Sequence, residues 1–330
     1  MKKRLAFILC CAVSLSLLLA ACGDGASTPS SQPPQQPSGP AAVQYTQGFK
    51  TSNNAIDDYK TTVCDQQGTI QALEYETPAY AYDESVTLTK TAYIYLPYGY
   101  DEAQNYNILY LMHGGGENET YWLVDERFGQ TTCNVLDNMI KDGICDPVIV
   151  VTPTFNEEGF EGEGEHNAEL CVVFGKELRN NLIPAAESQY STYANGDTSV
   201  ENLIATRDHR AFAGFSMGSM TSIQSGLMQN LDIISYVGSY SGALTTVDEF
   251  MTAMNSDALK DFSIGFWYNG NGRGDMALEE HDEFAHGVLD AMGGRLTDGE
   301  NFAWINMRDG GHMYLSWIVD LYNSLLVFFK

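Results

Sequence analysis

The sequence predicts one α/β domain built on an eight-stranded, mostly parallel sheet with helices on both faces. Three observations support this prediction. Short runs rich in Val, Ile, Tyr and Phe alternate with helical patterns along most of the chain, and such alternation is typical of βαβ crossovers. Two of these runs, 108–112 and 148–151, are apolar throughout, as central strands covered on both faces should be. Pro, Gly and charged residues are scattered rather than pooled, so no second linker divides the domain.

The strands are expected where β-branched and aromatic residues are concentrated. In chain order these runs are Thr69–Glu76, Ala92–Leu96, Ile108–Met112, Val148–Thr152, Ala211–Gly214, Ile234–Ser239, Ser263–Tyr268 and Ala303–Met307. The first two lie close together in the chain, which predicts an antiparallel hairpin or meander. The later runs are separated by helical stretches, so we expect them to pair in parallel through right-handed crossovers.

The helices are expected where apolar residues recur with a helical period between the later strands. These stretches are Ala168–Ser188, Met217–Met228, Val247–Leu259, Ala277–Met292 and Leu315–Phe328. Helices that connect parallel strands cover both faces of the sheet, which completes the predicted architecture.

The first 43 residues are predicted to be a targeting segment followed by a tether. Basic residues precede an uncharged run, 5–21, that is short for a transmembrane helix and suits a signal peptide. The run ends at Leu19-Ala20-Ala21-Cys22, which resembles the bacterial lipobox. This predicts a signal peptide over 1–21, lipid on Cys22, a Ser/Pro/Gln-rich tether over 22–43 and a folded domain over 44–330, anchored outside the cytoplasm. A plain secretory signal is the alternative.

The charge balance limits the partners. Asp and Glu number 43 against 17 Lys and Arg, a formal charge of −26, and so acidic a surface repels nucleic acid and anionic lipid. The membrane would be reached only through the lipid anchor. Four cysteines remain once the signal peptide and the lipid-carrying Cys22 are set aside, and they could form disulfides in any of three full pairings or stay as buried thiols. These are Cys64, Cys133, Cys145 and Cys171. No Cys/His cluster appears, so no metal site is predicted.

A Gly-x-Ser-x-Gly string carries the first chemical signal. Gly214-Phe215-Ser216-Met217-Gly218 follows a predicted strand and opens a helical stretch, the context in which this string forms a nucleophile elbow. The glycines are required because side chains there would collide with the neighbouring strand and helix. Ser216 is therefore the candidate nucleophile.

A glycine run at the end of an earlier strand supplies a candidate oxyanion hole. His113-Gly114-Gly115-Gly116 follows the strand at 108–112, where backbone N–H groups can approach a developing negative charge. Gly114, Gly115 and the N–H of Met217 are the candidate donors. An ordinary tight turn is the alternative for the glycine run alone.

The base and the acid follow from chain order. Of the six histidines, His312 comes after the last strand, where a Ser…Asp…His arrangement presents its base. Asp275 ends the glycine-rich segment after the penultimate strand, and would fix the tautomer of the imidazole and stabilise its cation. Asp309 is the rival acid, whereas Asp261 and Asp282 are expected to be solvated helix-end charges.

Two further features have open interpretations. Trp122, after the glycine run, either lines an acyl pocket or packs in the core. The acidic segment 157–166 is either a cation site or, as we expect, a solvated charge run.

At this point the sequence resembles carbohydrate esterase family 1, the esterase D type of α/β-hydrolase, and especially bacterial feruloyl esterases attached to xylanases. The resemblance covers about 93–329, and four segments carry most of it. These are Tyr110–Glu119, Val150–Asn156, Ile183-Pro184 with Glu187–Tyr193, and His209-Arg210 leading into the elbow. The family's nucleophile, acid and base fall on Ser216, Asp275 and His312, the three residues selected independently above.

The resemblance implies a serine esterase that needs no cofactor and releases feruloyl or acetyl groups from plant cell-wall xylan or oligosaccharide esters. Feruloyl esterases carry aromatic residues after the segment that matches Ser241-Gly242, whereas this chain has Ala243-Leu244-Thr245-Thr246, so the acyl group stays open. A siderophore or other small-ester hydrolase is the second hypothesis. A non-catalytic polysaccharide-binding lipoprotein is the third.

Overall fold

The computed structural model of the protein describes residues 48–160 and 168–330, and the described residues belong to one compact unit. Their centre is an eight-stranded sheet with the strand order β1-β2-β4-β3-β5-β6-β7-β8. The predicted signal peptide, Cys22 and the tether lie outside the described residues, as do positions 161–167 of the acidic segment.

All eight predicted strands are present in the described part of the chain. They are β1 Thr69–Ala79, β2 Asp83–Leu96, β3 Asn107–Met112, β4 Val148–Thr152, β5 Arg210–Phe215, β6 Tyr236–Tyr240, β7 Phe266–Gly272 and β8 Phe302–Met307. β1 and β2 form the expected antiparallel pair, and β2 is also antiparallel to β4. All the remaining pairs are parallel, so the carboxyl ends of β3, β5, β6, β7 and β8 meet at one edge of the sheet.

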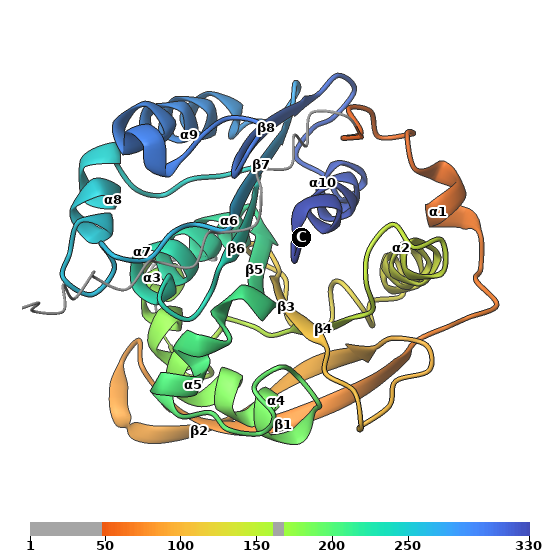
Figure 1. The fold of residues 1–330 in the computed structure, drawn as a ribbon, viewed down its shortest axis with the longest axis horizontal. Helices are drawn as coiled ribbons and strands as arrows, with labels where there is room; N and C mark the ends of the chain where they lie inside the picture. The colour runs from red at the N-terminus through yellow and green to blue at the C-terminus, as the bar shows by residue number, and fades with distance from the viewer. Residues whose placement is uncertain (1–47, 161–167) are drawn as a thin grey trace, which may run out of the picture. The chain divides into compact units, whose positions relative to one another are not determined.

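Helices cover both faces of the sheet (Figure 1). On one side lie α1 Asp57–Thr61, α2 Gly129–Lys141 and α10 Tyr314–Val327; on the other lie α3 Ala168–Glu177, η1 Leu178–Leu182, α6 Met217–Thr221, η3 Ser222–Leu227, α7 Met228–Asn230, α8 Val247–Met254 and α9 Leu278–Met292. The strands contribute alternate side chains to two core clusters, one under each layer. This confirms the predicted three-layer architecture.

Three helices were not expected from the sequence: α1, α2 and α5 Val200–Ala205. The helix α2 has no capping side chain, and Phe128 occupies the N-cap position. Its Thr and Asn content also gives it weak intrinsic helix propensity. It forms because Val135, Leu136 and Met139 are buried in the core beneath it, which is tertiary stabilisation that a local pattern does not report.

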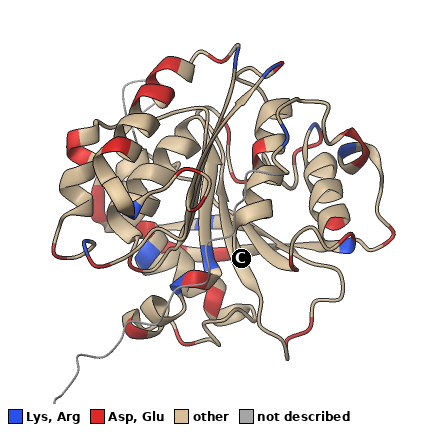
Figure 2. Ribbon diagram, turned by 45° about the horizontal axis from the view of Figure 1, so that its top comes forward, with Lys and Arg blue, Asp and Glu red and all other residues tan. Residues whose placement is uncertain are grey.

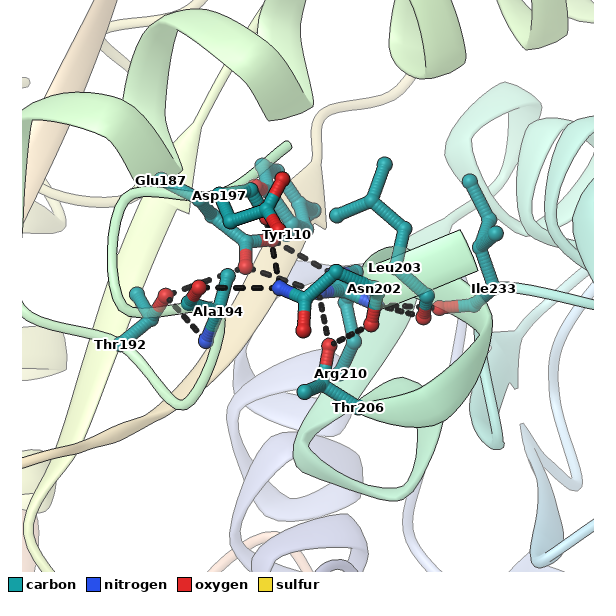
Figure 3. Close-up of polar contacts among 10 residues, drawn as sticks. All are labelled: Tyr110, Glu187, Thr192, Ala194, Asp197, Asn202, Leu203, Thr206, Arg210 and Ile233. Carbon is teal, nitrogen blue, oxygen red and sulfur yellow. Dashed lines mark hydrogen bonds and ion pairs between the residues drawn. The ribbon is translucent and has the colours of Figure 1, made fainter. Parts of the chain in front are cut away.

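A buried ion pair ties the start of β5 to α4 Ile183–Gln189 (Figure 3). The guanidinium of Arg210 donates from Nε and Nη2 to the two carboxylate oxygens of Glu187, at 2.5 and 2.8 Å. The hydroxyls of Tyr110 and Thr192 donate to the same carboxylate. Glu187 and Arg210 both lie in segments that carry the family resemblance. Part of that sequence similarity therefore reflects the anchoring of β5, the strand that leads to Ser216.

Acidic residues are spread over the outer helices and loops (Figure 2). No described helix is long and apolar enough to cross a membrane. The four cysteines of the described residues are free thiols. Of the two alternatives for these residues, the structure favours free thiols, which are buried at Cys64, Cys145 and Cys171 and half-buried at Cys133.

Candidate active site

Ser216 occupies a strained turn between β5 and α6. Its φ is 54° and its ψ is −119°, a conformation that a residue with a side chain adopts at a cost. Its N–H donates to the carbonyl of Tyr240 on β6 at 2.8 Å, which helps to hold the turn. A Cβ on Gly218 would lie 2.4 Å from the carbonyl oxygen of His113, and one on Gly214 would lie 2.7 Å from the carbonyl of Gly218. Both glycines are therefore required sterically, as predicted.

The structure brings the three predicted side chains together at the carboxyl edge of the sheet. Nε2 of His312 lies 3.0 Å from Oγ of Ser216, and Nδ1 lies 2.9 Å from Oδ1 of Asp275. A proton on Nδ1 donates to the carboxylate, which leaves Nε2 free to accept the serine hydroxyl. Ser216 follows β5, Asp275 follows β7 and His312 follows β8, so each is carried by a different strand.

Asp275 is nearly buried and ionised. Burial opposes its charge, but the hydrogen bonds from His312 and the N–H of Ala277, together with the nearby hydroxyl of Ser241, outweigh that penalty and lower the pKa of the carboxyl below its ordinary value. The Ala277 N–H donates to Oδ1 at 2.8 Å. The carboxylate is thus available as an acceptor at neutral pH.

The segment before Asp275 differs from the expectation. The sequence 269–272, predicted as loop, is the end of β7. A Cβ on Gly272 would lie 2.2 Å from the carbonyl carbon of Gly310, and the N–H of Gly274 donates to the oxygen of Gly310 at 2.9 Å. These glycines let the two chain segments that carry Asp275 and His312 approach each other closely.

The rival acid, Asp309, points away from the imidazole. Its carboxylate accepts hydrogen bonds from the Ser52 hydroxyl and the Asn53 N–H, both at 2.8 Å. Asp309 therefore anchors the first described loop to the end of β8.

Other histidines have packing roles. Burial lowers the pKa of His113 to about 4, and its ring lies between the carbonyl of Gly114 and the hydroxyl of Thr154, each at 2.7 Å. Burial also lowers the pKa of His281 to about 3. His113 thus stays neutral at physiological pH and holds the first glycine of the run in place.

A cavity of about 810 Å³ opens over Ser216 and His312. About half of the residues that line it are aromatic or methionine, and Glu117, Arg127 and Glu280 add charged groups. The aromatic and methionine residues are Tyr121, Phe128, Phe215, Met217, Met220, Met276, Met313, Tyr314 and Trp317. Gly115 and Met217, two of the predicted oxyanion donors, line this cavity. Gly114 packs instead against the ring of Phe215, which a Cβ there would overlap at 2.4 Å.

Trp122 does not line the cavity, so its prediction as a substrate-binding residue is wrong. It is completely buried, and its indole N–H donates to the carbonyl of Met112 at 3.1 Å. Its ring lies edge-on to Phe215. The packing alternative for Trp122 is the one observed.

Sequence reasoning missed several cavity residues. Met276 and Met313 directly follow Asp275 and His312 in the chain, and this adjacency is the signal that could have found them. Ser241 follows β6 and Trp317 lies in α10, and only the fold brings these two residues to the cavity.

The described part of the acidic segment has structural contacts. Glu157 accepts the N–H of Ala81 at 2.9 Å, and the carbonyl of Glu158 accepts the hydroxyl of Tyr82. Within residues 48–160 and 168–330, no group of three or more His, Cys, Asp or Glu side chains could hold a metal ion.

Comparisons with known proteins identify the family. The family model "Esterase", described as "Putative esterase", matches residues 85–297, more than half of the chain. Endo-1,4-beta-xylanase Y of Acetivibrio thermocellus is 44% identical over 203 residues, which are 61% of this chain and 16% of the xylanase. The chain therefore spans only a small part of that relative.

Solved structures share the fold. A mutant of the feruloyl esterase module from Clostridium thermocellum, complexed with sinapinate, aligns with a TM-score of 0.69 and 31% identity over 88% of this chain and 95% of that one. A ferulic acid esterase from Anaeromyces mucronatus aligns with a TM-score of 0.66 and 22% identity, over 86% and 98%. These matches confirm the predicted α/β-hydrolase fold. By sequence and by fold, the chain belongs to the esterase family and resembles the feruloyl esterases of carbohydrate esterase family 1.

Proposed function

We propose that this protein is a serine carboxylester hydrolase that releases feruloyl groups from plant cell-wall xylan or its oligosaccharides through an acyl-enzyme on Ser216. The observation that carries the proposal is the continuous hydrogen-bonded chain from Ser216 through His312 to Asp275, at 3.0 and 2.9 Å. A serine hydroxyl is a weak nucleophile until a base accepts its proton, and this chain supplies that base.

In the first step, Oγ of Ser216 attacks the ester carbonyl while Nε2 of His312 takes the hydroxyl proton. The carbonyl oxygen becomes an oxyanion, which accepts hydrogen bonds from the N–H groups of Met217 and Gly115. Asp275 stabilises the imidazolium. The bond to the sugar oxygen then breaks, and His312 gives its proton to that leaving oxygen. Water then attacks the carbonyl carbon of the acyl-enzyme while His312 takes one of its protons. The bond between that carbon and Oγ of Ser216 breaks, His312 returns the proton to Oγ, and the product leaves as ferulic acid, which ionises to ferulate.

The shape of the cavity favours an aromatic acyl group over acetyl. An acetyl group would fill a small part of about 810 Å³. Phe215 and Trp317 stack with ring centroids 3.9 Å apart, and Phe128 and Tyr314 stack at 4.2 Å. These four aromatic side chains line the cavity with the methionine side chains, and such a lining suits a flat phenolic ring.

The relatives support the same substrate class. The Clostridium thermocellum module of known structure is named a feruloyl esterase, and the similar protein from Acetivibrio thermocellus is named an endo-1,4-beta-xylanase. We infer that this chain works on released or intact feruloylated arabinoxylan.

The direct test is to measure ferulate and acetate released from feruloylated, acetylated arabinoxylan by the purified protein, with Ser216→Ala as the blank. Ferulate that disappears in the variant is the expected result. Release of acetate alone would make the protein a deacetylase. If neither product is released, the hypotheses to test next are a hydrolase of siderophore or other small esters and a binding protein without turnover.

We also propose that the protein is exported and held at the outer face of the bacterial cell membrane by lipid on Cys22. The basis is the lipobox-like string at 19–22 and the Ser/Pro/Gln-rich stretch that follows it. Labelled palmitate should enter the wild-type protein and not the Cys22→Ser variant. Equal labelling of both, or labelling of neither, would contradict the anchor.

A further inference from the structure

Ser241 is a second strained serine beside Ser216. It follows β6 directly, its φ is 63° and its side chain is buried. Its N–H donates to the carbonyl of Gly270 on β7 at 2.9 Å. Non-glycine residues in this region of backbone conformation cluster at functional sites, because surrounding structure must hold them there. The strain at Ser241 points to a specific task for its hydroxyl.

The indole of Trp317 determines which way that hydroxyl points. Its N–H donates to Oγ of Ser241 at 2.9 Å. An indole nitrogen can only donate, so Ser241 is the acceptor in this contact and its own proton must be directed elsewhere. The same indole lies edge-on to the imidazole of His312, with ring centroids 5.2 Å apart. Trp317 therefore contacts both Ser241 and the base.

The acceptor available to that proton is the second oxygen of Asp275. Oδ1 of Asp275 is occupied by His312 and by the N–H of Ala277. Oδ2 is buried and has no hydrogen-bond partner within the described residues. Ser241 lies close enough to contribute to the lowered pKa of the carboxyl. A buried carboxylate oxygen without a donor is costly, and the hydroxyl proton of Ser241 is the candidate donor.

We propose that Ser241 is a positioning residue: oriented by Trp317, it donates to Oδ2 of Asp275 and so fixes the carboxylate plane in which Oδ1 meets His312. This inference rests on the proposed function, since it assigns a role within the same Ser-His-Asp arrangement. Without the hydroxyl, the carboxylate is free to rotate about its Cβ–Cγ bond, and the imidazole loses a fixed partner. Substrate binding should change little, because Ser241 acts through Asp275.

The chain provides a matched control two residues earlier, within β6 itself. Ser239 is also fully buried, and its Oγ accepts the indole N–H of Trp267 at 2.9 Å. That pair is not among the residues that line the cavity. Ser239→Ala therefore measures the general cost of removing a buried serine that accepts an indole hydrogen bond.

The experiment compares the full-length wild type with Ser241→Ala, Ser241→Gly and Ser239→Ala. For both Ser241 variants we expect kcat on methyl ferulate to fall about 10- to 100-fold, the range of a lost hydrogen bond to a charged group, with KM within about two-fold. Ser241→Gly also relieves the backbone strain, so a loss shared by both variants belongs to the hydroxyl. Ser239→Ala should keep kcat within about two-fold. Melting temperatures establish that each variant is folded.

Two readouts separate failure of this inference from failure of the proposed function. The downfield proton resonance of the imidazole N–H bonded to Asp275 should shift or broaden in Ser241→Ala and stay in place in Ser239→Ala. The rate at which a fluorophosphonate labels Ser216 should fall with kcat. If the wild type is labelled but hydrolyses no ester, the proposed function fails while these readouts still test Ser241. If resonance and labelling rate are the same in Ser241→Ala and Ser239→Ala, the inference is overturned.

Discussion

The ion pair between Arg210 and Glu187 should be among the most expensive interactions to break in this domain. Both side chains are 1% exposed, and Arg210 also donates to the backbone carbonyls of Leu203 and Ile233. Replacing Arg210 with Met leaves the Glu187 carboxylate buried beside two hydroxyl groups and without its cation. Removing one partner of a buried pair costs about 3–5 kcal/mol of unfolding free energy. We expect that range for Arg210→Met.

A surface pair gives the matched control. Nζ of Lys176 lies 2.7 Å from Oε1 of Glu84, and both side chains are more than half exposed. An exposed pair contributes about 0–1 kcal/mol, so Lys176→Met should cost no more than that. The double variant Arg210→Met/Glu187→Met should be more stable than Arg210→Met alone, because it removes the unpaired charge.

Urea unfolding measures these differences directly. The midpoints should shift while the slope with denaturant stays constant, which shows that the variants differ in stability rather than in the compactness of either state. A loss below about 1 kcal/mol for Arg210→Met, equal to that of Lys176→Met, would refute the reasoning. It would mean that the Glu187 carboxylate is hydrated or becomes protonated once its cation is removed.

Three further predictions concern the site. Asp275→Asn should lower kcat on methyl ferulate about 10²- to 10⁴-fold in steady-state assays, because the neutral amide neither fixes the tautomer nor stabilises the imidazolium. Folding lowers the pKa of Asp275, so the ionised carboxylate stabilises the folded state above pH about 4. That stabilisation disappears as the pH falls through the lower, folded-state pKa. Acid unfolding curves of the wild type and Asp275→Asn should therefore converge at the acid end of this range. Gly218→Ala should abolish turnover, since its Cβ would lie 2.4 Å from a backbone oxygen, whereas Gly226→Ala, with 3.6 Å of clearance, should retain it.

Local signals were sufficient to predict the residues of the site that follow strands. Ser216 is marked by its flanking glycines and by the strand before it, and His312 by its place after the last strand. Asp275 follows from the strand order, because the carboxyl ends of parallel strands meet at one edge. Each of these predictions needed only the order of elements along the chain, which hydrophobic patterning reports well.

The remaining features depend on tertiary neighbours. The Asn- and Gly-rich end of β7 has the composition of a loop, yet it pairs on both sides, with Gly270 opposite Tyr240 of β6 and Ile305 of β8. Pairing with two strands overrides weak strand propensity. A Cβ on Gly270 would overlap the Asp320 carboxylate of α10, so packing explains this glycine. No local pattern distinguishes a tryptophan that lines a pocket from one that packs in the core. The sequence therefore leaves both roles possible for Trp122.

The central claim is that ester hydrolysis passes through a covalent acyl group on Ser216. Mass spectrometry of the protein quenched during turnover of methyl ferulate tests it most directly. The account predicts a feruloyl adduct on the peptide that contains Ser216, its accumulation before steady state, and its absence from Ser216→Ala together with turnover. Ferulate release that persists in Ser216→Ala would contradict the account.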